Sequence, residues 1–137
     1  MNKDFPDKIP VFPLSGVIYF PRTNLPLNIF EERYLDLVKD SFRNDKLMGM
    51  VQSKRENSLV YKVGCLGKIS DFQETSDGRV LIKLTGITRF EITKEITSKK
   101  KYREFEVDYK RFYKDLITPN KVEAVYDKIN FMEKVKD

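Results

Sequence analysis

The chain has no histidine among its 137 residues, and its only cysteine is Cys65. Without histidine, it cannot by itself build a Ser-His-Asp or Cys-His catalytic group, or a zinc site of the usual Cys/His kind. A single cysteine excludes an intrachain disulfide, which fits a reducing compartment. None of the six glycines has the spacing of a phosphate-binding loop that ends in Gly-Lys-Ser/Thr. We therefore expect no catalytic site, no metal and no cofactor.

Long apolar runs are also missing. Charges and prolines interrupt the first ten residues, MNKDFPDKIP, so they offer no core for a signal peptide. The longest apolar-looking stretch, residues 9–20, is broken by Pro10, Pro13, Ser15 and Gly16 and is far too short to cross a bilayer. These absences predict a soluble, cytoplasmic protein without a membrane partner.

The length and charge point to one small domain. The mass is 16.2 kDa, and 26 Lys and Arg face 21 Asp and Glu, a formal charge of +5. A chain of this size buries roughly 68% of its extended surface, enough for a core without disulfides. We expect one domain with an appendage.

Local patterns predict one early helix and about six strands. Prolines between residues 9 and 27 exclude a helix interior there and favour short strands or edge segments. From Glu31 the spacing predicts a helix whose apolar stripe contains Tyr34, Leu35, Val38 and Phe42. Strand-like runs then follow at residues 47–53, 59–64, 67–74, 79–86, 87–96 and 103–112.

Two of these runs have a clear buried face. Ser76-Asp77-Gly78 predicts a hairpin turn, because Asp-Gly readily adopts positive φ values. In the following run, Val80, Ile82 and Leu84 share one face, and from Arg103 onward Phe105, Val107 and Tyr109 alternate with acidic residues. Short strands at close spacing with a single early helix predict a mainly β fold with some α, a small barrel.

A second helix is expected at the C-terminal end. It would start at Thr118-Pro119, because proline is tolerated in a first helical turn. Apolar residues follow at helical spacing, namely Val122, Val125, Tyr126, Ile129 and Met132. The chain stops about one turn later, so we expect residues 116–137 to be the start of a helical region cut short at Asp137, after a β domain at residues 1–115.

Serine–lysine neighbours, such as Ser70 near Lys68, have no motif context and read as surface residues. Cys65 lies in the apolar segment Val63-Gly64-Cys65-Leu66-Gly67. That setting favours a small buried side chain over a reactive thiolate, which needs cationic or helix N-terminal neighbours.

The positive charge is concentrated in one segment. Residues 94–114 hold eight cationic and four anionic side chains, with Tyr102, Tyr109, Phe112 and Tyr113 among them. A basic groove with aromatic platforms is one way to hold single-stranded nucleic acid. The alternative is a lysine-rich loop that keeps a sheet edge soluble, and charge alone carries no readout information.

Two stretches of the chain, residues 9–42 and 63–92, resemble the N-terminal substrate-binding domain of the Lon protease family. The likeness covers residues 9 to about 110. Its motifs are Phe12-Pro13-Leu14, Phe20-Pro21, Pro26-Leu27, Ile29-Phe30-Glu31, Arg33-Tyr34, Asp77-Gly78-Arg79, Gly86 and Arg89-Phe90. Two departures stand out: the family often has glycine where Arg22 stands and proline where Glu32 stands.

The resemblance implies a PUA-like β-barrel with one packed helix, followed in longer members by a helical bundle. It implies a core role for Phe12, Phe20, Phe30 and Tyr34, a turn-setting role for Pro21 and Pro26, and no room for a side chain at Gly86. It implies that Arg33 pairs with a carboxylate or a carbonyl. No catalytic motif comes with it, and the ATPase and peptidase modules of full Lon enzymes are absent.

The leading hypothesis is a non-enzymatic module that engages unfolded or partner proteins. Extended substrate could add to an unpaired barrel strand through main-chain hydrogen bonds. The alternative is an RNA-binding PUA-like module. Candidate partner contacts are Arg22, Leu25, Lys99, Lys100, Lys101 and Tyr102.

Overall fold

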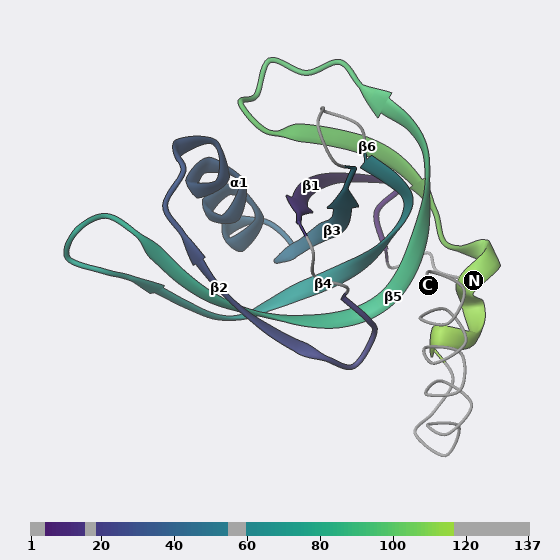
Figure 1. Ribbon diagram of the computed structural model, residues 1–137, viewed down its shortest axis with the longest axis horizontal. Coiled ribbons are helices and arrows are strands. Elements are labelled where there is room, and N and C mark those ends of the chain that lie inside the picture. Colours follow the sequence, from purple (N-terminus) through teal and green to yellow (C-terminus); the bar gives the residue numbers. More distant parts are fainter. Residues whose placement is uncertain (1–4, 16–18, 55–59, 117–137) are drawn as a thin grey trace.

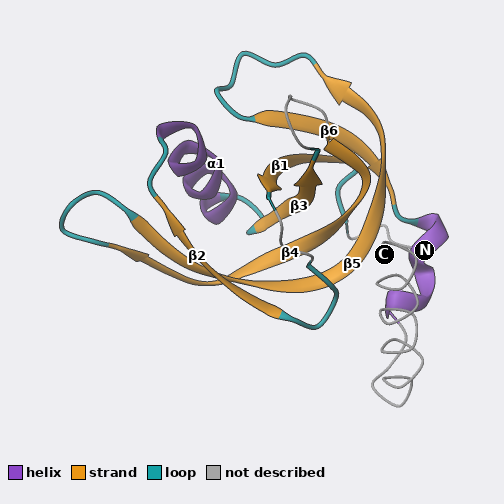
Figure 2. Ribbon diagram, viewed as in Figure 1, coloured by secondary structure: helices purple, strands orange, loops and turns teal. Residues whose placement is uncertain are grey.

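The computed structural model describes residues 5–15, 19–54 and 60–116. The fold is mainly β, with one α-helix and one 3₁₀ segment (Figure 2). In chain order the elements are β1 (Lys8–Leu14), β2 (Asn24–Ile29), α1 (Glu32–Arg43), β3 (Leu47–Ser53), β4 (Val60–Glu74), β5 (Val80–Ile96), β6 (Arg103–Asp108) and η1 (Lys110–Leu116). The helix expected from Thr118 lies outside the described residues. None of the helices in the described part is long and apolar enough to cross a membrane.

The six strands form one sheet that closes on itself. Its order is β2-β5-β4-β3-β1-β6, and β5 also pairs with β6. β1, β3, β4, β5 and β6 therefore make a closed ring, which confirms the predicted barrel-like fold. β2 lies outside this ring and pairs with the first part of β5 over Asn24–Ile29 and Val80–Thr85. We call β2, Val80–Thr85 and the end of β4 from Ile69 to Glu74 the extension (Figure 1).

Four of the predicted strands fuse into two long ones. The runs at 59–64 and 67–74 are one strand, β4, and those at 79–86 and 87–96 are one strand, β5. Their register shifts between Leu66 and Gly67 and again between Ile69 and Asp71. Such irregularities bend and twist a strand pair. The same two strands can therefore line the ring and then run out into the extension.

The helix α1 is covered on two sides, which explains where its burial departs from the predicted stripe. Tyr34 and Val38 are buried as expected, but Leu37, at 0% exposed, and Ser41 are buried too. Leu35 and Phe42 are only partly buried. Since α1 lies between the outer side of β1 and β3 and the inner side of the extension (Figure 1), its buried face is wider than one stripe.

Two apolar clusters share the interior. One fills the ring around Phe90, and the other packs α1 against the extension around Leu37. β3 contributes to both, because Leu47 and Val51 belong to the ring cluster while Met48 and Met50 belong to the α1 cluster. A strand covered on both faces reads as a continuous apolar run, as LMGMV does here.

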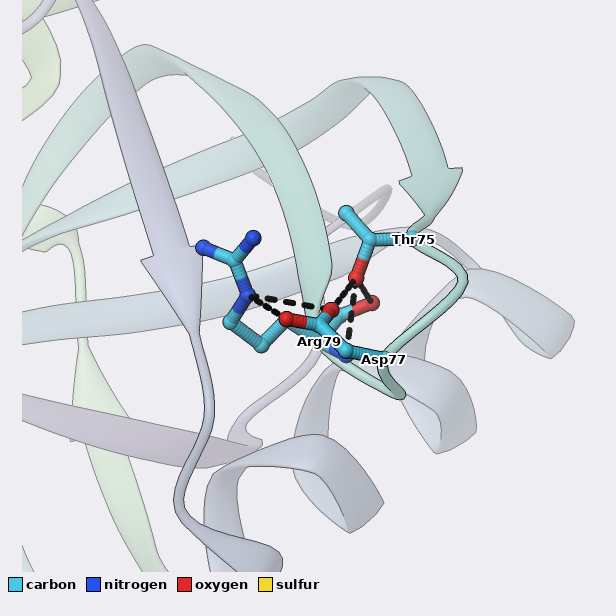
Figure 3. Close-up of polar contacts among 3 residues, drawn as sticks. All are labelled: Thr75, Asp77 and Arg79. Carbon is cyan, nitrogen blue, oxygen red and sulfur yellow. Dashed lines mark hydrogen bonds and ion pairs between the residues drawn. The ribbon is translucent and has the colours of Figure 1, made fainter.

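The tip of the extension is the hairpin predicted at residues 76–78. Gly78 has φ +90°, in the left-handed region that suits glycine. The Thr75 hydroxyl donates to Asp77, and the Arg79 Nε donates to both Asp77 carboxylate oxygens at 3.0 and 3.1 Å (Figure 3). These bonds hold the pKa of Asp77 below its usual range. The three residues therefore fix the shape of the turn.

A buried ion pair attaches η1 to the ring. The Arg89 side chain donates two hydrogen bonds to Asp115, at 2.8 and 2.9 Å, and the Arg89 backbone N–H donates a third at 2.9 Å. The Arg89 guanidinium also lies 4.7 Å from the Phe112 ring centre. Asp115 is almost completely buried, and both of its carboxylate oxygens accept these bonds. The end of the described chain is thereby held against β5.

Candidate protein-interaction surface

The loop before β2 is built around Gly86. A Cβ at Gly86 would lie 2.3 Å from the Phe20 carbonyl oxygen, so the predicted lack of room for a side chain is confirmed. The Arg22 N–H donates to the Gly86 carbonyl at 2.9 Å, and the Gly86 N–H donates to the Thr23 carbonyl at 2.9 Å. These bonds join the loop to the point where β5 passes from the extension into the ring.

Arg22 and Leu25, two of the predicted contacts, lie at the start of β2. Arg22 is exposed and has φ 66°, a left-handed conformation that favours glycine. Leu25 is partly buried and packs against the α1 cluster. Of these two residues, Arg22 offers the larger accessible surface.

Phe30, at the corner between β2 and α1, corrects one prediction. It was expected in the core, but 67% of it is exposed. Ile29 just before it is buried and pairs with Val80, so the alternation along β2 turns Phe30 to the opposite side. Of the other aromatic residues expected in the core, Tyr34 is buried, Phe12 is partly buried against the same cluster, and Phe20 is only partly buried.

The residues beside Phe30 form a corner between β2 and α1. The Arg33 guanidinium pairs with Glu31 at 3.2 Å, as the resemblance implied, and lies 4.7 Å from the Tyr34 ring centre. Pro21 sits in a turn as expected, whereas Pro26 lies within β2 and not in a turn. Phe30 is thus presented between a paired strand and the first turn of a packed helix.

The loop between β5 and β6 carries the other four predicted contacts. The Lys101 ammonium donates to Glu32 at 2.8 Å, Lys100 pairs with Glu104 at 3.6 Å, and Lys99 is exposed. The Lys101 bond lowers the pKa of Glu32 and raises that of Lys101. Because Glu32 is two residues after Phe30, this loop lies against the corner that carries Phe30.

Tyr102 is buried beneath this loop and not displayed by it. It is 4% exposed, and its hydroxyl donates to the Asp40 carboxylate at 2.7 Å. Burial, and then the hydrogen bond to Asp40, raise the pKa of Tyr102. Little of the Tyr102 side chain is accessible to a partner, and its hydrogen bond to Asp40 attaches the loop to α1. An open hollow of about 420 Å³ remains along residues 95–98 and 100–103.

The basic segment is largely neutralised within the fold. Its cations pair with carboxylates: Arg103 with Glu95 at 2.8 Å, Lys94 with Glu106 at 4.0 Å and Arg111 with Glu91 at 3.7 Å. Its aromatic residues Tyr102, Tyr109 and Phe112 are buried, and Tyr113 is the exception at 59% exposed. A basic groove with stacking platforms is therefore not formed by residues 94–114, and the RNA-binding alternative is not favoured.

The described residues hold no cluster of side chains that could bind a metal ion. No group of three or more His, Cys, Asp or Glu gathers among them. Cys65 is buried as predicted, and burial raises the pKa of its thiol, which keeps it protonated. Glu104 and Glu106 lie on the outer side of β6 and take part in surface ion pairs.

The predicted contacts thus fall into two groups at opposite ends of β2, a strand roughly 20 Å long at about 3.3 Å per residue. Arg22 and Leu25 lie at its start, and Lys99–Lys101 lie beside the helix that follows its end. The structure does not bring the two groups together. It adds Phe30, which the sequence analysis missed because an aromatic after alternating apolar residues resembles another core position.

Comparison with known proteins identifies the kind of domain. Residues 8–134 match the family model described as the ATP-dependent protease La (LON) substrate-binding domain. The Lon protease of Cytophaga hutchinsonii is 27% identical over 101 residues, 69% of this chain and 12% of that protein. The Lon protease of Endomicrobium trichonymphae is 27% identical over 126 residues, 88% of this chain and 16% of that protein. The chain therefore spans only a small part of these relatives.

Solved structures give the same result. The Lon N-terminal domain protein from Xanthomonas campestris superposes with a TM-score of 0.64 at 28% identity, covering 74% of this chain and 59% of that one. The N-terminal domain of the Mycobacterium avium complex Lon protease has a TM-score of 0.59 at 15% identity, covering 74% and 54% of the two chains. The second likeness concerns the fold alone.

Proposed function

This chain belongs to the Lon substrate-binding domain family, and from that premise we propose that it is a non-enzymatic module that recognises unfolded proteins or a protein partner. The match concerns the substrate-binding domain alone and covers 12% to 16% of the Lon proteases compared above. Protein cleavage and ATP hydrolysis are accordingly not part of the proposal.

The observation that carries the proposal is the exposure of Phe30 between a paired strand and a packed helix. Large aromatic side chains are the commonest energetic centres of protein interfaces, and they work best on a frame that needs no ordering. Phe30 is 67% exposed between β2, which pairs with β5, and α1, which packs on the core. An apolar segment of another protein gains buried area there at little conformational cost.

Only some of the contacts predicted from the sequence border the Phe30 corner. Lys99, Lys100 and Lys101 lie on the loop that Lys101 ties to Glu32, so they border the Phe30 corner. Lys100 and Lys101 pair with carboxylates of this chain, and the exposed Lys99 offers a cation to an acidic flank of a partner. Arg22 and Leu25 form a second, smaller patch at the far end of β2. Tyr102 contributes by holding the lysine loop in place. We propose the Phe30 corner as the main contact.

The direct test is a titration with a permanently unfolded probe, reduced and carboxymethylated α-lactalbumin, followed by fluorescence anisotropy of the labelled probe. A small interface is expected to bind in the range of tens of micromolar. Phe30→Ala is expected to weaken binding by about tenfold, which corresponds to about 1.4 kcal/mol. Its stability is expected to change by no more than about 0.5 kcal/mol, because the side chain is exposed.

The matched control is Tyr113→Ala. Tyr113 is another exposed aromatic, but η1 lies on the opposite side of the molecule from α1 (Figure 1). Its removal is expected to leave the affinity unchanged. Absence of binding by the wild-type chain at tens of micromolar contradicts the proposed function, whereas equal losses in both variants contradict the proposed site.

The proposal includes the division of the chain and its location. We propose a β domain at residues 1–115 and the start of a helical region at residues 116–137, with a cytoplasmic location. The Arg89–Asp115 ion pair supports a boundary after Asp115, since the β domain needs this carboxylate. A chain ending at Leu116 is expected to unfold cooperatively, and one ending at Tyr109 to lose stability. Equal stability of the two chains contradicts the boundary.

A further inference from the structure

β2 is an open edge of the sheet. Each ring strand pairs with at least two other strands, whereas β2 pairs with β5 on one side and with no other described strand on the other. The end of β4 from Ile69 to Glu74 also pairs with β5 alone, but β2 is open along its whole length. An unpaired strand edge offers backbone N–H and C=O groups to any extended chain, including a second copy of the protein. A module that recognises unfolded proteins would be exposed to such strand addition whenever it meets one.

The hydrogen bonds next to β2 establish which of its backbone groups face outward. The Gly86 N–H donates to the Thr23 carbonyl, so the Thr23 carbonyl points toward β5. Backbone groups alternate along a strand, and the residues that share the orientation of Thr23 are Leu25, Leu27 and Ile29. The outward-facing groups therefore belong to Asn24, Pro26 and Asn28.

Pro26 occupies the centre of this outward row. Proline has no N–H, and it is tolerated within sheets where its nitrogen faces away from the neighbouring strand. Its pairing position opposite Lys83 fits this rule, because β5 loses no hydrogen bond there. The two donors that remain, from Asn24 and Asn28, belong to a residue type that is depleted in strands.

We propose that Pro26 closes the β2 edge to strand addition, so that partner proteins are held by side chains at the Phe30 corner and not by main-chain pairing along β2. An incoming strand would find no donor at the middle of the row, and its own carbonyl there would lose water without gaining a partner. Closure of the edge concerns this chain alone, whereas the mode of partner binding rests on the proposed function.

The test replaces the proline and follows self-association of the intact chain. Pro26→Val restores the missing N–H, and Asn28→Val is the matched control, because it places the same exposed valine on β2 without adding a donor. Analytical ultracentrifugation is expected to show at least tenfold tighter self-association for Pro26→Val than for the wild type or Asn28→Val. Hydrogen exchange is expected to show slowed amides at positions 24, 26 and 28 in the associated state.

A second variant separates edge pairing from misfolding. Pro26→Val combined with Asn28→Pro moves the missing donor two residues along the same row and is expected to return the chain to the wild-type state. Association that persists in this double variant, or a Pro26→Val variant as monomeric as Asn28→Val, overturns the proposal. So does wild-type self-association that slows exchange at Asn24 and Asn28.

The mode of partner binding has its own readout. Hydrogen exchange of the wild-type chain with carboxymethylated α-lactalbumin is expected to leave the Asn24 and Asn28 amides as fast as in its absence. Slowed exchange at both overturns side-chain recognition. A chain that does not bind the probe contradicts the proposed function, yet closure of the edge is still decided by the self-association of Pro26→Val.

Discussion

The ring and the extension share β4 and β5, yet they are stabilised in different ways. In the ring every strand is hydrogen-bonded on both sides, and the interior is filled around Phe90, which is 0% exposed. In the extension β2 is hydrogen-bonded on one side, and the apolar face depends on α1 for cover. Closure of the sheet stabilises the first region, and side-chain packing against a helix stabilises the second.

This difference bears on where the molecule can interact. Each ring strand has partner strands on both sides along part of its length, and the cations of the β5–β6 hairpin are largely paired. The extension side carries the open edge of β2 and leads directly to the exposed Phe30. The less constrained region of the sheet thus borders the surface that we propose for partner binding.

The joint between the two regions gives the largest expected effect. Gly86→Val places a side chain against the Phe20 backbone, where even a Cβ would approach the carbonyl oxygen to 2.3 Å. Because backbone cannot give way as a flexible side chain can, we expect a loss of more than about 4 kcal/mol or no folding at all. Urea denaturation followed by circular dichroism measures it.

The control for this change is Gly78→Asn. Gly78 has φ +90°, and a Cβ there would have nothing within 4 Å, so only the backbone conformation matters. Asparagine tolerates positive φ better than other residues, and a loss of less than about 1 kcal/mol is expected. A Gly86→Val variant as stable as Gly78→Asn contradicts the packing of the loop on Gly86.

Core truncations compare the two regions directly. Phe90→Ala in the ring is expected to cost about 3–5 kcal/mol, and Leu37→Ala in α1 about 2–5 kcal/mol, since both side chains are fully buried. The two variants should differ more in which region opens than in the total loss of stability. Native-state hydrogen exchange is expected to show faster exchange confined to the extension in Leu37→Ala, and across the whole sheet in Phe90→Ala.

Faster hydrogen exchange across the whole sheet in both variants contradicts the view that the extension depends on α1. Met48→Ala offers a further check, because Met48 belongs to the α1 cluster although it lies on a ring strand. It is expected to follow the pattern of Leu37→Ala.

The smallest expected effect is a loss of folding stability at low pH. The Arg103 side chain donates to Glu95 at 2.8 Å, and this hydrogen bond lowers the pKa of Glu95. A carboxylate with a lowered folded pKa stabilises the fold above its unfolded value, about 4.3, and that stabilisation disappears as pH falls through the folded value. Because the Arg103–Glu95 pair is partly exposed, it stabilises the fold by no more than about 1 kcal/mol.

Glu95→Gln is therefore expected to lose a little stability at pH 7 and to show a weaker decline between pH 5 and pH 3 than the wild type does. Urea denaturation at both ends of that range measures the difference. A decline unchanged by the substitution contradicts the assignment to Glu95, and Asp77, whose pKa is lowered by Thr75 and Arg79 in the extension, is then the next residue to replace.

Much of the fold could be predicted from local pattern. Alternation from Arg103 placed Phe105, Val107 and Tyr109 inside, and the strand at 47–53 has the expected bounds. The errors have a common cause, which is that local pattern does not show what lies on the second side of an element. Leu37 is buried because α1 is covered twice, and Phe30 is exposed because the chain turns into α1 after Ile29.

The candidate surface was harder to predict than the fold. Charge density drew attention to residues 94–114, but in the structure long-range partners such as Glu32 and short-range ones such as Glu104 neutralise the lysines. Tyr102 was expected at the surface, but it is buried and its hydroxyl is hydrogen-bonded to Asp40, 62 positions away in the sequence. Pairings over such separations leave no trace in local spacing.

Residue order by itself determined the family, the turn at Asp77-Gly78, the faces of single strands and the lack of histidine-based chemistry. Only the tertiary structure decided that the strands close into a ring, that β2 stays outside it with Pro26 on its open edge, and that Phe30 faces outward. The physical reason is that periodicity encodes which face of an element is apolar, whereas burial depends on what distant segments bring to that face.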